Sequence, residues 1–114
     1  MNQGIRTVIY PVTDIAQAKT LYRRLLGVEP YMDEAYYVGF RVGDQEIGLD
    51  PHGHRKGMTG PVGYWQVNDI QTSLRQLLDA GAQVQQEVQD VGGGKLIAWV
   101  KDADGNITGL VQSP

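Results

Sequence analysis

The chain has 114 residues, a formal net charge of −3 and no cysteine. This length is typical of one domain, and the absence of cysteine excludes disulfides and zinc–thiolate sites and favours a reducing cytoplasm. The ten Lys and Arg residues are scattered, which excludes a nucleic-acid footprint, and no apolar run approaches the roughly 18 residues that span a membrane.

The first half of the sequence predicts a strand, a helix and further strands. An apolar run over residues 5–12 is followed by Asp14, a typical helix N-cap, and then by a helical repeat of apolar residues that Gly27 ends. Two β-type runs follow, at residues 35–42 and 43–50.

The second half repeats this order. A run over residues 62–67 leads to Asp69 as the cap, and an apolar helix face follows until Gly81. Three β-type runs come next, at residues 82–88, 95–102 and 106–112, with a glycine-rich hairpin linker over residues 91–95.

The two halves are in register. Thr7, Val12 and Asp14 recur as Val62, Val67 and Asp69 at one constant spacing, and the last strands align IGLD with TGLV, so that Gly48 matches Gly109. We therefore predict a single domain over residues 1–114 of two βαβββ modules, residues 1–51 and 62–114, joined by a loop over residues 52–61.

Two such modules, the V-x-D-I step into each helix and the D-x-D-G-N turn before the last strand resemble the vicinal oxygen chelate superfamily. This superfamily includes glyoxalase I, extradiol dioxygenases and bleomycin-resistance proteins. The resemblance implies an α+β fold in which the modules form an open, curved β-barrel around a cleft, with the helices outside. It also implies a homodimer.

Metal-using members of this superfamily place one ligand on the first and one on the last strand of each module. The resemblance puts these positions at Thr7, Gly48, Val62 and Gly109, none of which offers a carboxylate, imidazole or amide. We therefore expect no metal and no cofactor. Gly48 and Gly109 would then leave space for a bulky bound molecule.

Strand alternation predicts which side chains line the cleft. The orientation of Trp99 stays open, because either Trp99 or its two neighbours could face inward. The candidate ligand-binding residues are Thr7, Ile9, Gly48, Asp50, Val62, Tyr64, Gln66, Trp99 and Gly109.

Asp50 is the best candidate for a catalytic carboxylate, although capping the loop that begins at Pro51 is the simpler interpretation. Together with His52 and His54 it could also form a relocated metal site, but the glycine-rich context favours a solvated turn.

Three functions follow. The leading hypothesis is a metal-independent protein that binds a small molecule, an antibiotic or a metabolite. The alternative is a glyoxalase-like lyase or isomerase that uses relocated ligands or metal-free acid–base chemistry. A third hypothesis is an interaction module with no small ligand, in which the cleft is a vestige of the fold; bulky residues that fill the cleft would support it, and Gly48 and Gly109 count against it.

Overall fold

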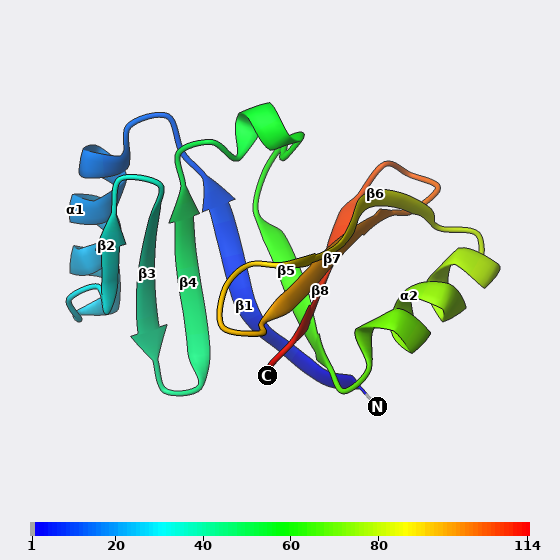
Figure 1. Ribbon diagram of the computed structural model, residues 1–114. Coiled ribbons are helices and arrows are strands. Elements are labelled where there is room, and N and C mark those ends of the chain that lie inside the picture. Colours follow the sequence, from blue (N-terminus) through cyan, green and yellow to red (C-terminus); the bar gives the residue numbers. More distant parts are fainter. Residues whose placement is uncertain (1) are drawn as a thin grey trace. The chain divides into compact units, whose positions relative to one another are not determined.

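A computed structural model describes residues 2–114 and shows two α-helices and eight strands over that range (Figure 1). The elements of the first half are β1 (Asn2–Pro11), α1 (Ile15–Leu26), β2 (Met32–Glu34), β3 (Tyr37–Val42) and β4 (Gln45–Asp50). A short 3₁₀ turn at His54–Lys56 leads into the second half, which contains β5 (Val62–Val67), α2 (Ile70–Asp79), β6 (Gln83–Asp90), β7 (Leu96–Lys101) and β8 (Ile107–Gln112).

The chain divides into two compact units, which we call module one and module two. Module one consists of residues 6–62, and module two consists of residues 63–114 with the N-terminal end of β1 as far as Ile5.

In module one the strand order is β2-β3-β4-β1, with β1 parallel to β4 and the other neighbours antiparallel. Val38, Phe40 and Leu49 form the buried core, and α1 covers this face of the sheet (Figure 1). Tyr10 and Tyr22 pack there as a tilted pair with ring centroids 5.0 Å apart.

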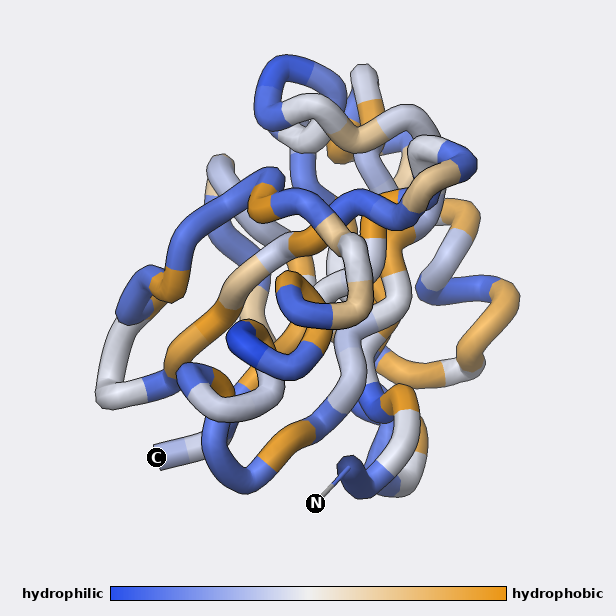
Figure 2. Tube along the Cα trace, turned by 90° about the vertical axis from the view of Figure 1, so that its right-hand side faces the viewer, coloured by the Kyte–Doolittle hydropathy of each residue, from blue (hydrophilic) through white to orange (hydrophobic). Residues whose placement is uncertain are grey.

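In module two the strand order is β5-β8-β7-β6, with β5 parallel to β8. Its buried core joins α2 to one face of the sheet and consists of Val67, Ile70, Leu74, Ala98, Val100 and Leu110. Coloured by hydropathy, the Cα trace alternates between hydrophobic and hydrophilic stretches along its length (Figure 2).

Both helices begin where the sequence predicts. The side chain of Asp14 accepts a hydrogen bond from the backbone N–H of Gln17, and Asp69 accepts one from Thr72. Gly27 ends α1 in the left-handed conformation at φ 71°, where a side chain would be strained.

The α+β class and the two βαβββ modules are confirmed. The strand that the sequence runs did not identify is β2, which is three residues long and contains two acidic residues, so composition does not mark it. Its pairing with β3 creates it instead. Over residues 2–114 no helix is long and apolar enough to cross a membrane.

Candidate functional site

In module one, the predicted residues of the first and last strands share the sheet face opposite α1. Tyr10, Val12, Ile47 and Leu49 pack on the helix side. Because alternate residues of a strand point to opposite faces, Thr7, Ile9, Gly48 and Asp50 lie on the other face. Thr7 and Asp50 are buried there.

Two glycines lie side by side on this face, and tyrosine rings cover both. Gly48 of β4 and Gly39 of β3 are register partners. A Cβ placed on Gly48 would meet the hydroxyl and ring of Tyr37, and a Cβ placed on Gly39 would lie 2.9 Å from the Tyr31 ring. The backbone N–H of Tyr31 donates to the Gly39 carbonyl at 2.9 Å, which holds the residue beside that glycine.

Two charged groups complete this arrangement. The Tyr37 hydroxyl donates to Glu46 Oε2 at 2.6 Å, and the guanidinium of Arg41 lies 3.9 Å from the centroid of the Tyr31 ring. Burial, followed by the hydrogen bond and negative charge of Glu46, raises the pKa of Tyr31 to about 12. We call Tyr31, Tyr37, Arg41 and Glu46 the Tyr–Glu cluster.

Module two covers its equivalent glycine with different residues. Tyr64 and Trp99 are the direct neighbours of Gly109 on the two adjacent strands. An added Cβ on Gly109 would lie 2.5 Å from Cδ2 of Tyr64, and Trp99 Nε1 donates to the Tyr64 hydroxyl at 2.6 Å. The two side chains are only 3% and 5% exposed.

The open question about β7 is thereby answered. Ala98 and Val100 belong to the core under α2, so Trp99 lies on the face of Tyr64 and Gly109. Val62 is also buried, and Gln66 is half-buried and donates from Nε2 to Ser113 Oγ at 2.9 Å.

The space beside Gly48 and Gly109 is filled by side chains, which differs from what the sequence interpretation expects. We expected room for a bound molecule at Gly48 and Gly109, but the ring of Tyr37 or Tyr64 occupies the position of the missing Cβ. The physical reason is close approach: without a Cβ, the strand backbone lets an aromatic ring of the same module lie directly on it.

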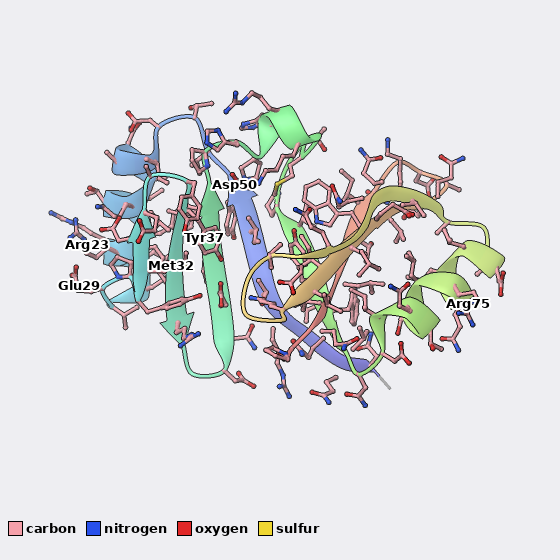
Figure 3. The ribbon with its side chains drawn as sticks, viewed as in Figure 1. Arg23, Glu29, Met32, Tyr37, Asp50 and Arg75 are labelled. Atoms are coloured by element: carbon pink, nitrogen blue, oxygen red, sulfur yellow. The ribbon has the colours of Figure 1, made fainter. Side chains whose placement is uncertain are left out.

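Asp50 is placed as a loop cap at the end of β4 (Figure 3). Its Oδ1 accepts the backbone N–H of His52 at 2.8 Å, and its Oδ2 accepts Lys56 Nζ at 2.7 Å. Both carboxylate oxygens therefore serve the loop, as the capping interpretation expects.

The donor chemistry does not fit a metal ion at the four superfamily positions, which carry a hydroxyl, a valine and two glycines. The His52 ring contacts Arg55. Across residues 2–114 no three His, Asp or Glu side chains come together in a way that could hold a metal, so Asp50, His52 and His54 do not form a relocated site.

The sequence interpretation missed the Tyr–Glu cluster. A usable signal was present, because alternation from Gly48 also brings Glu46 to the same face, and the facing strand offers Tyr37, Gly39 and Arg41 at the same parity. The part that alternation could not supply is Tyr31, which precedes β2 and reaches Gly39 from a turn.

Comparison with known proteins agrees with this architecture. The model of the Glyoxalase/Bleomycin resistance protein/Dioxygenase superfamily matches residues 4–109. No curated protein sequence gives a significant match.

Several solved structures share the fold. A glyoxalase/bleomycin resistance protein/dioxygenase superfamily member from Vibrio splendidus 12B01 is 14% identical, with a TM-score of 0.73 over 99% of this chain and 100% of that chain. Methylmalonyl-CoA epimerase from Mycobacterium tuberculosis is 20% identical, with a TM-score of 0.73 over 99% and 90%. The Mn(II)-bound glyoxalase from Novosphingobium aromaticivorans is 21% identical, with a TM-score of 0.72 over 98% of this chain and 40% of that chain.

Proposed function

The chain belongs to the Glyoxalase/Bleomycin resistance protein/Dioxygenase superfamily, and from this premise we propose that it binds a small organic molecule, an antibiotic or a metabolite, without a metal ion. The ligand-binding residues are those on the sheet faces turned away from the helices. A cytoplasmic location and a homodimer stay predictions, the second to be tested by sedimentation equilibrium.

One observation carries the proposal. Two of the four superfamily ligand positions, Gly48 and Gly109, are covered by tyrosine rings, and the other two, Thr7 and Val62, provide only a hydroxyl and an alkyl group. In each module, a face that carries an aromatic ring and a few polar groups suits an organic ligand better than a divalent cation.

The first experiment is elemental analysis of untagged protein, purified without chelator and challenged with zinc, nickel, manganese and iron(II). We expect near-zero metal after dialysis, while the same metal-free protein binds members of a small-molecule library in a thermal-shift screen. A metal that survives dialysis at about one ion per chain and is lost in His52→Ala would contradict metal independence. Failure of the metal-free protein to bind any compound would contradict small-molecule binding.

A second function has a specific observation in its favour. Glu46 receives a 2.6 Å hydrogen bond from Tyr37, and a carboxylate with a phenol partner can hold and return a proton. This supports metal-free lyase or isomerase chemistry with Glu46 as the base in place of Asp50, which caps the loop through the His52 N–H and is ion-paired with Lys56. Turnover by the wild type that is lost in Glu46→Gln, with binding retained, would favour the enzyme.

A further inference from the structure

Glu46 has acceptor capacity beyond its tyrosine partner. The carboxylate is half-buried on β4, and Tyr37 donates to one of its oxygens at 2.6 Å. An ionised carboxylate offers about four lone-pair sites. Even with the hydrogen bond from Tyr31 that raises the pKa of that phenol, acceptor sites are left for N–H donors of a ligand.

The Tyr31 ring, which lies near Glu46, already receives a cation. The guanidinium of Arg41 lies 3.9 Å from the Tyr31 centroid, within the range in which a ring face attracts positive charge. Because Gly39 and Gly48 carry no Cβ, the rings of Tyr31 and Tyr37 lie directly against the strand backbone. Tyr31 is 43% exposed, so its ring can be reached from solvent.

The charges on this face favour a cationic ligand. Glu34 is the register partner of Tyr37, so it shares the face with Glu46, and register partners point to the same side of a sheet. Arg41 opposes these two carboxylates with one positive charge. Asp50 is balanced by its ion pair with Lys56.

We infer that the Tyr–Glu cluster is a recognition site for an organic cation, an ammonium or guanidinium group carried on an aromatic or apolar body. The cation would be held by Glu46 and by the face of Tyr31, where it would take the place of Arg41. This inference rests on the proposed function, because it names the ligand class that the protein binds.

The test uses three probes of one shape and different charge on the full-length, metal-free protein: benzylammonium, benzyl alcohol and benzoate. Isothermal titration calorimetry should give the tightest binding for benzylammonium, with a dissociation constant about tenfold lower than that of benzyl alcohol. A hydrogen bond to a charged group contributes a difference of this size. Glu46→Gln should abolish this preference. The matched control is Glu87→Gln on β6, an exposed carboxylate of module two, which should leave the preference unchanged.

Arg41→Gln gives the sharpest outcome. Removing the internal cation should strengthen benzylammonium binding by about twofold or more, because the Tyr31 ring face becomes available. A cluster that only supports the sheet would show no such gain. If Glu46→Gln does not fold, Tyr31→Ala provides the same test at an exposed ring and should weaken benzylammonium binding.

The possible outcomes distinguish failure of the cation site from failure of the proposed small-molecule binding. Tighter binding of benzoate, equal binding of all three probes, or a charge preference that persists in Glu46→Gln would overturn the cation site while small-molecule binding stands. If neither the probes nor the compound library bind to metal-free protein, the proposed function fails as well.

Discussion

The two modules place a glycine at the same position of their last strand and cover it from opposite directions. In module one the ring over Gly48 comes from Tyr37 on β3, the antiparallel neighbour of β4. In module two the ring over Gly109 comes from Tyr64 on β5, the parallel neighbour of β8. Tyr37 is half-buried and donates a hydrogen bond to the Glu46 carboxylate, whereas Tyr64 is buried and accepts a hydrogen bond from Trp99.

The difference indicates that the same arrangement, a strand glycine covered by a tyrosine ring, has a different role in each module. A strand without a Cβ admits an aromatic ring in both modules. In module two the ring is fixed between neighbours and contributes to packing, while in module one it borders exposed charged groups that a ligand can reach. We therefore expect stability to depend mainly on the module two pair and ligand recognition on the module one cluster.

The largest effect should come from adding a methyl group to each glycine. Gly109→Ala should lower the free energy of unfolding by about 2–3 kcal/mol, because the new Cβ would lie 2.5 Å from a buried ring that cannot move away. Gly48→Ala should cost about 1 kcal/mol, because the half-buried Tyr37 can rotate outward. Urea unfolding measures both values.

Gly60→Ala is the matched control, since nothing lies within 4 Å of a Cβ at that position. Its free energy of unfolding should change by less than about 0.5 kcal/mol. Equal losses at Gly48 and Gly109 would show that the two rings are held alike, and the comparison would fail.

A smaller effect should follow removal of each ring's hydroxyl. Tyr64→Phe removes the hydroxyl that accepts the hydrogen bond of the buried Trp99 indole N–H, and it should lower the free energy of unfolding by about 1–2 kcal/mol. Tyr37→Phe should cost less, about 0.5 kcal/mol, because Glu46 can bind water instead. Tyr36→Phe, at a side chain that is 57% exposed, is the control. A greater loss for Tyr37→Phe than for Tyr64→Phe would reverse the assignment of roles.

The smallest effect concerns pH and belongs to module one. The pKa of Tyr31 is raised from 10.0 to about 12, so the folded protein retains this proton where the unfolded chain loses it. Its contribution to stability is therefore complete below pH 10 and is lost as the pH rises through about 12. In an absorbance titration of tyrosinate, Tyr31→Phe should remove one phenol that ionises near pH 12, and an unchanged profile would contradict the raised pKa of Tyr31.

Local patterns in the sequence were sufficient for the modules, for the helix starts at Asp14 and Asp69 and for the faces of the first and last strands of each module. Each depends on neighbours within a few residues: a cap bonds to the third residue on, and alternation has a period of two. Once the superfamily resemblance identifies the metal-ligand positions, residue type alone shows that Thr7 and Val62 are unsuited to bind a divalent metal.

Tertiary structure decided what lies over the glycines. The sequence repeat relates Gly48 to Gly109, yet it does not relate Tyr37 to Tyr64, which stand on different strands of their modules. Which ring reaches a glycine depends on cross-strand register and on the side chains that compete for the same space. Those contacts join residues that are distant in the chain, so local sequence patterns cannot predict them. As a result, a tyrosine ring of the same module occupies the space beside Gly48 and Gly109 that the sequence interpretation reserved for a ligand.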